Sequence, residues 1–123
     1  MTTQPTQTLF RPVGRCELEL IEGSQWQAFP PRLPGQPFFY PVLNEGYATQ
    51  IARDWNTRDE ASGFVGHVTR FEVCAEYLAG FEVRCVGGAE HLEYWIPAAG
   101  LPGFNAKLVG AIELVASFGA EGS

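Results

Sequence analysis

HVTRFEVC, residues 67–74, alternates regularly between two sets of side chains. One face of the extended chain would carry Thr69, Phe71 and Val73, and the opposite face Val68, Arg70 and Glu72. A period of two residues is the pattern of a β-strand, in which successive side chains point to opposite sides. This segment therefore predicts a strand in the middle of the chain, and the remaining elements are placed around it.

Segments rich in aromatic and β-branched residues lie on both sides of this strand. We expect further strands over residues 8–13, 26–29, 38–42, 81–86, 90–96 and 107–118. The last of these segments is apolar enough to predict a central position in a sheet. Gly87-Gly88 predicts a hairpin turn between its two neighbouring strands.

Helical spacing is clearest over residues 45–55, where apolar side chains recur on one face. These side chains are Tyr47, Ala48, Ile51, Ala52 and Trp55. Asn44 precedes them and is the predicted N-cap of this helix. We expect shorter helical segments over residues 17–22, closed by Gly23, and over residues 75–79.

Many short strands and few helices predict an α+β fold with a mixed or antiparallel sheet, rather than a doubly wound parallel sheet. The 123 residues suit one domain, which we place at 8–118. Residues 1–7 are predicted to form a disordered leader, and residues 119–123 a flexible tail. The proline-rich segment 30–37 predicts a rigid connecting loop in preference to a motif for proline-binding modules.

The bulk composition excludes several classes of function. Hydrophobic residues make up 46% of the chain, which is enough for a folded core. The formal net charge of −6 argues against nucleic-acid and anionic-membrane partners. No apolar segment approaches the ~20 residues of a membrane span, and the first residues lack the features of a signal peptide. Three cysteines suit a reducing compartment, so we expect a cytoplasmic protein.

The cysteines and histidines do not follow a metal-binding pattern. Cys74, Cys85, His67 and His91 match no zinc spacing, so we expect no metal site. One hairpin register places Cys74 opposite Cys85, and we expect both to remain thiols in the cytoplasm.

The segment 90–96 carries the most suggestive arrangement of polar residues. Leu92, Tyr94 and Ile96 fall on one face of the predicted strand, and His91, Glu93 and Trp95 on the other. A carboxylate beside an aromatic side chain lies in a partly apolar setting, which can serve catalysis. A solvated strand face explains the same pattern, and the residues alone leave both interpretations open.

Three segments together resemble a known family. They are LFRP at 9–12, FFY at 38–40 followed by NEGYA at 44–48 and RDW at 53–55, and EHLEYWIP at 90–97. The chain resembles small bacterial proteins labelled "ADP-ribosylation/crystallin J1" and, more distantly, a minimal ADP-ribosyltransferase fold. The resemblance implies an ADP-ribosyltransferase-like domain that binds NAD as a substrate and transfers ADP-ribose or hydrolyses NAD, without a metal.

The same resemblance assigns roles to individual residues. It implies that Arg11 and Glu93 are catalytic, with Arg11 binding the NAD diphosphate and Glu93 stabilising the positive charge that develops on the ribose. The implied NAD-binding residues are Arg11, Phe39, Tyr40, Asn44, Tyr47, His91 and Trp95. The aromatic members of this set would stack on nicotinamide or adenine.

Two departures from the family pattern support an alternative. No hydroxyl residue follows Tyr40 in the second motif, and His91 occupies the position where the family often has a carboxylate or a glutamine. The alternative is a catalytically inactive module on the same fold that binds a nucleotide or a protein. A third hypothesis, based on the charge of −6, is an interaction protein whose acidic face covers a basic partner.

Overall fold

The computed structural model describes residues 5–85 and 91–119. Its largest sheet has three antiparallel strands in the order β1 (Thr6–Val13), β3 (Val65–Cys74) and β7 (Glu113–Gly119). Two short antiparallel pairs accompany it: β2 (Phe38–Phe39) with β6 (Ile96–Pro97), and β4 (Val83–Cys85) with β5 (Leu92–Tyr94). The predicted α+β class with antiparallel sheets and short helices is confirmed.

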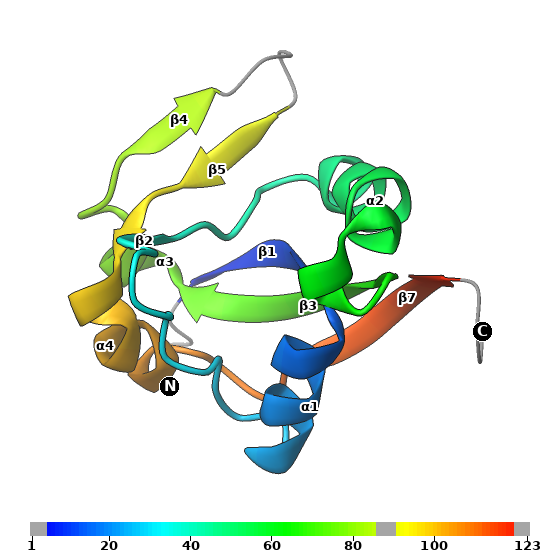
Figure 1. Cartoon of the computed structure of the whole chain (residues 1–123). Helices are drawn as coiled ribbons and strands as arrows, with labels where there is room; N and C mark the ends of the chain where they lie inside the picture. Colours follow the sequence, from blue (N-terminus) through cyan, green and yellow to red (C-terminus); the bar gives the residue numbers. More distant parts are fainter. Residues whose placement is uncertain (1–4, 86–90, 120–123) are drawn as a thin grey trace.

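The helices lie at opposite ends of the central strand (Figure 1). α1 (Arg15–Gly23) follows β1, and α2 (Glu45–Asp54) packs against β1 and β3. α3 (Ala75–Leu78) and α4 (Leu101–Ala106) lie near the other end of β3. Three 3₁₀ turns, η1 (Asn56–Arg58), η2 (Glu60–Ser62) and η3 (Ala98–Gly100), complete the described elements.

The helix with the clearest sequence pattern forms as predicted. Asn44 has an extended backbone, and its side-chain oxygen accepts a hydrogen bond from the Tyr47 amide at 3.1 Å. This bond satisfies an amide that has no partner within the helix, which is the function of an N-cap. Asn44 therefore has a structural role as the N-cap of α2.

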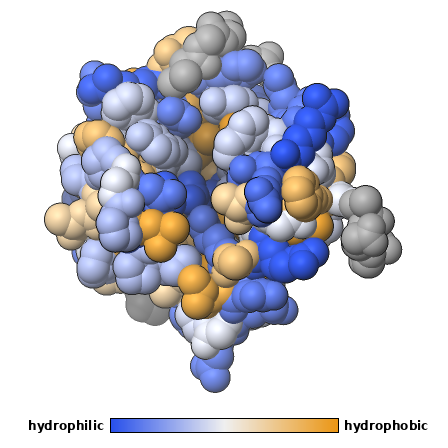
Figure 2. Space-filling view, in the orientation of Figure 1, coloured by the Kyte–Doolittle hydropathy of each residue, from blue (hydrophilic) through white to orange (hydrophobic). Residues whose placement is uncertain are grey.

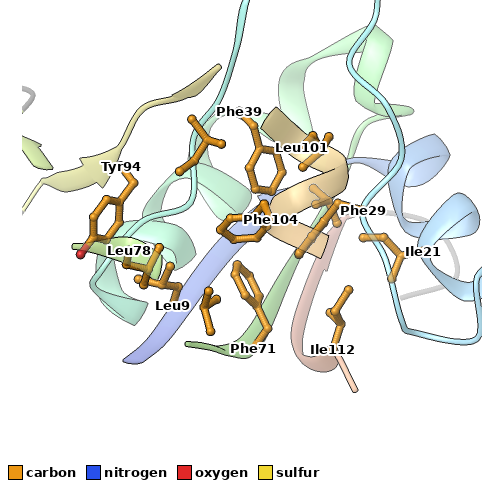
Figure 3. Close-up of a cluster of buried hydrophobic side chains, with 13 residues drawn as sticks. Leu9, Ile21, Phe29, Phe39, Phe71, Leu78, Tyr94, Leu101, Phe104 and Ile112 are labelled. Atoms are coloured by element: carbon orange, nitrogen blue, oxygen red, sulfur yellow. The ribbon is translucent and has the colours of Figure 1, made fainter. Parts of the chain in front are cut away.

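The core gathers aromatic side chains from four separate segments. Phe104 lies among Phe29, Phe39 and Phe71, with ring centroids 6.4, 5.2 and 6.1 Å away respectively (Figure 3). Phe29 and Phe71 meet edge to face at 4.8 Å. Tilted and edge-to-face pairs at these distances add to the stabilisation that burial alone provides. This cluster fixes α4 and β2 relative to the central sheet.

The first strand begins earlier than predicted. Thr6 and Gln7 pair with Cys74 and Val73, although both lie within the segment expected to be a disordered leader. The Thr6 hydroxyl also donates to a Glu72 oxygen at 3.0 Å. A polar segment joins a sheet when its backbone groups find partners, so a prediction from composition alone was wrong for these two residues. Residues 1–4 and 120–123 of the predicted leader and tail lie outside the described residues.

The predicted strand at 107–118 is wrong in both extent and position. β7 covers Glu113–Gly119 and lies at an edge of the sheet, while β3 is the central strand. β3 has the greater burial, with Val68 and Val73 completely covered. Apolar composition does not distinguish an edge strand with one packed face from a strand packed on both faces.

Two local predictions also need correction. Residues 26–29 do not form a strand, because Gln25 and Trp26 have φ values of 64° and 63° and turn the chain instead. Cys74 and Cys85 do not face each other, since Cys74 pairs with Thr6 and Cys85 with Leu92. The predicted turn at Gly87-Gly88 lies outside the described residues.

Candidate functional site

A cleft of ≈ 500 Å³ lies between the end of β1, α1, the proline-rich loop and the segment that follows α2. Arg11, Tyr40 and Glu93 all line it, although they come from distant parts of the chain. Figure 2 shows hydrophilic surface near the middle of this face of the molecule, with hydrophobic side chains beside it. The two residues that the family resemblance implies to be catalytic therefore share one cleft.

Arg11 is held by protein groups rather than presented to solvent. Its Nε and Nη2 donate to the two Glu17 carboxylate oxygens at 2.6 and 3.0 Å. Its guanidinium also lies 4.6 Å from the centroid of the Phe39 ring. β1 supplies the arginine and α1 the carboxylate, so this bidentate ion pair joins the two elements at the cleft wall.

Replacing Glu17 with glutamine is expected to destabilise the fold by about 2 kcal/mol, because it leaves the Arg11 charge buried without a counter-charge. The Arg11 side chain is only 9% exposed, so water compensates little of the loss. Urea denaturation of Glu17→Gln beside the exposed Glu19→Gln measures the difference. Equal denaturation midpoints for the two variants would show that the ion pair contributes nothing to stability.

Glu93 lies in the middle of β5 and is half-buried in the cleft wall. The indole Nε1 of Trp95 donates to its Oε1 at 3.0 Å. Burial raises the pKa of Glu93 above its ordinary value, and the Trp95 hydrogen bond opposes this shift in part. The environment of Glu93 is therefore partly apolar, as the sequence pattern suggested.

The raised pKa predicts how Glu93 affects stability as the pH changes. A carboxyl group with a folded-state pKa above its unfolded value favours folding at low pH, and this contribution is lost as the pH rises through the folded pKa. At pH 7 the charged form therefore costs stability, and Glu93→Gln is expected to raise the Tm by about 2 °C. The gain in Tm should shrink at pH 4, where the Glu93 carboxyl is largely neutral in both the folded and the unfolded state. Calorimetry at the two pH values tests this, and a gain that is independent of pH would contradict it.

The remaining predicted ligand-binding residues divide into three groups. Trp95 contacts Glu93 and packs edge to face on Tyr40, with centroids 5.4 Å apart. Tyr47 and His91 stack on each other at 4.3 Å and do not line the cleft. Phe39 is 1% exposed and faces the core, so its ring contributes packing rather than a stacking surface.

Arg32 is a cleft residue that the sequence analysis did not select. Its Nε donates to the Phe38 carbonyl oxygen at 2.9 Å, and it forms no ion pair with a carboxylate of the described chain. Burial lowers its pKa, and the neighbouring charge of Arg11 lowers it further. An arginine between prolines was the available signal, because a rigid loop fixes where its side chain emerges.

The segment after α2 forms a small polar network in another part of the cleft wall. Asn56 Nδ2 donates to Ser62 Oγ at 2.8 Å, and Ser62 Oγ donates to Asp59 Oδ2 at 2.7 Å. Asn56 Oδ1 is buried and has no hydrogen-bond partner. A buried acceptor in this state costs about 1–3 kcal/mol of stability. No prediction from the sequence covers this segment.

Metal-binding groups, membrane-spanning helices and similarity to known proteins give no further indication of function. Within residues 5–85 and 91–119, no group of three or more acidic, histidine or cysteine side chains is placed to hold a metal ion. No helix in that part of the chain is long and apolar enough to cross a membrane. No protein-family model, curated protein or solved structure matches the chain in the comparisons with known proteins.

Proposed function

We propose that the cleft binds NAD or a related nucleotide, and that the protein is an ADP-ribosyltransferase-like enzyme that transfers ADP-ribose or hydrolyses NAD. The observation that carries this proposal is the convergence of Arg11, Tyr40 and Glu93, one from each family-like segment, on one cleft. The sparse cysteines suit a reducing compartment, so the proposal includes a cytoplasmic location.

Cleavage of the bond between ribose and nicotinamide requires one carboxylate that is partly shielded from water. The bond between ribose C1′ and the nicotinamide nitrogen breaks, and its electron pair returns to the pyridinium ring, so nicotinamide leaves neutral. Water or a target nucleophile then bonds to C1′ and loses one proton. Positive charge builds on the ribose during this exchange, and the ionised Glu93 carboxylate stabilises it. Its half-buried position strengthens that interaction relative to water.

Arg32 takes the role of diphosphate-binding residue in this proposal, because it lines the cleft without a carboxylate partner in the described chain, whereas the charge of Arg11 is paired with Glu17. Arg32→Gln is expected to weaken NAD binding about 10-fold, the effect of losing one charge-assisted contact. Isothermal titration with NAD measures the change. Arg53→Gln is the control, since Arg53 is exposed and paired with Asp54 outside the cleft. Equal losses in both variants would show that the effect is one of net charge.

A second candidate function is a catalytically inactive nucleotide- or protein-binding module. The ion pair between Arg11 and Glu17 favours this second function, since Arg11 then stabilises the fold instead of contacting a substrate. Incubation of the purified protein with NAD separates the two candidates. Nicotinamide release supports the enzyme, whereas binding without release supports the inactive module. Absence of both binding and release contradicts the nucleotide proposal.

A further inference from the structure

We propose that Trp95 is a positioning residue for Glu93, whose carboxylate its indole NH holds in one orientation at the cleft wall. The role of this contact in turnover rests on the proposed function, whereas the contact itself can be tested without NAD. Trp95 lies between β5 and β6, two residues after Glu93. Side chains at this spacing in an extended chain point to the same side, which brings the indole beside the carboxylate.

The contact between the two side chains is a charge-assisted hydrogen bond. Trp95 Nε1 donates to Glu93 Oε1 at 3.0 Å. An indole NH only donates and an ionised carboxylate only accepts, so the bond is strongest when Glu93 is ionised. Both side chains are half-buried, which limits competition from water. Trp95 therefore favours the charged form of Glu93 that the proposed reaction requires.

Three side chains from other segments fix the plane of the indole. The Trp95 ring lies 5.3 Å from the Phe38 ring and 5.4 Å from the Tyr40 ring, the latter edge to face. Arg84 on β4 places its guanidinium 4.2 Å from the centroid of the indole. Neighbours that lock a side chain in this way preserve the geometry of its hydrogen bond. These contacts use ring surface of Trp95, so they favour the positioning role over the NAD stacking that the resemblance implies.

The charged and titratable groups around Glu93 do not replace this hydrogen bond in the described part of the chain. Arg84 is the cross-strand neighbour of Glu93, but its guanidinium forms an ion pair with Glu82 at 3.0 Å. The charge of Glu93 raises the pKa of the Tyr47 phenol on α2, which stays neutral where carboxyl groups titrate. The other such groups are His91, which stacks on Tyr47, and the cleft residues Arg11, Cys16, Glu17, Arg32, Tyr40 and Asp59. Burial raises the pKa of Glu93 and the Trp95 hydrogen bond lowers it, so the indole favours ionisation.

The first test follows the ionisation of Glu93 by NMR on the full chain without a ligand. The Glu93 carboxyl carbon, assigned with Glu93→Gln, reports its own titration and separates it from that of His91. In the wild type, the Trp95 indole NH proton should titrate with the same midpoint as this carboxyl. In Glu93→Gln, which keeps an acceptor but cannot ionise, the Trp95 signal should no longer follow that midpoint.

Replacing Trp95 measures how strongly the indole acts on the carboxyl. Trp95→Phe should move the Glu93 titration midpoint upward by about one pH unit, because the donor that favours the ionised form is lost. Trp26→Phe is the matched control, since Trp26 is a partly buried indole outside the cleft lining. This control should leave the midpoint unchanged even if it lowers the stability of the fold.

Turnover of NAD separates positioning from ionisation. At a pH well above both midpoints, Glu93 is ionised in the wild type and in Trp95→Phe alike. Trp95→Phe should still release nicotinamide about 10-fold more slowly there, because the carboxylate is no longer held in one orientation. NAD affinity should change less than about 3-fold, since the contact does not involve the ligand.

The possible results distinguish the inference from the proposed function. A Trp95 indole NH that ignores the Glu93 titration would overturn the inference, and this measurement needs no variant at position 95 to fold. An unchanged midpoint in Trp95→Phe would overturn it as well. Full turnover by Trp95→Phe at high pH would remove the positioning role and leave the proposed function standing. Absence of nicotinamide release by the wild type would overturn the proposed enzyme, while the NMR titration still decides whether Trp95 holds Glu93.

Discussion

Glu93→Gln is expected to reduce nicotinamide release from NAD at least ~100-fold while NAD affinity changes less than about 3-fold. The glutamine keeps an acceptor for the Trp95 indole NH, so the local hydrogen bond that orients the side chain survives. The change removes the negative charge that stabilises the ribose cation. A loss confined to turnover is the signature of an interaction made in the transition state.

The experiment measures nicotinamide release and NAD binding on the same preparations. Glu82→Gln is a suitable control, because Glu82 is an exposed carboxylate beside β4 that does not line the cleft. Undiminished release by Glu93→Gln would remove Glu93 from the mechanism. An absence of release by the wild type, with NAD still bound, would favour the inactive binding module instead.

The pH dependence of turnover provides an independent check on the same residue. Because burial raises the pKa of Glu93, its ionised form is lost at a higher pH than for an exposed glutamate. The acid limb of the turnover profile should therefore lie above pH 4.5, the ordinary pKa of glutamate. The same ionisation of Glu93 therefore supplies the negative charge needed for catalysis and lowers the stability of the fold.

The sequence allowed strands to be predicted where side chains alternate between two faces, because alternation follows directly from the geometry of an extended chain. Residues 67–74 lie within β3, and Tyr94 and Ile96 are buried while Glu93 and Trp95 are only half-buried. The sheet order could not be predicted in the same way. It depends on which backbone groups pair, and Thr6 shows that even a polar residue joins the sheet when partners are present.

In the candidate site, only a residue that is recognisable by its chemical type alone could be predicted from the sequence. Glu93 stands out in its segment by its polar side chain on a half-buried strand, and the structure places it in the cleft wall. The pairing of Arg11 with Glu17 and the orphaned oxygen of Asn56 depend on side-chain directions that no spacing rule specifies. Such contacts arise from the packing of α1 and the segment after α2, which the sequence does not reveal residue by residue.

Gly66→Ala is expected to destabilise the fold by about 3 kcal/mol, the largest effect we predict for a single methyl group. A Cβ at Gly66 would lie 2.1 Å from the Ala52 carbonyl oxygen and 2.8 Å from the Ala52 Cα. Both atoms belong to the backbone of α2, so no side-chain rotation relieves the overlap. The helix must move away from β3 as a unit, which opens the packing around Ala48 and Ala52.

This displacement also connects the fold to the site. Trp55 follows the last residue of α2, and η1 with Asn56 follows at once, so a shift of the helix moves this part of the cleft wall. Gly66→Ala should therefore lower both the urea midpoint and the affinity for ADP-ribose. Gly23→Ala is the matched control, since a Cβ there meets nothing within 4 Å and should leave both quantities unchanged. If Gly66→Ala were as stable as the control, the close contact between α2 and β3 would not be what positions the cleft.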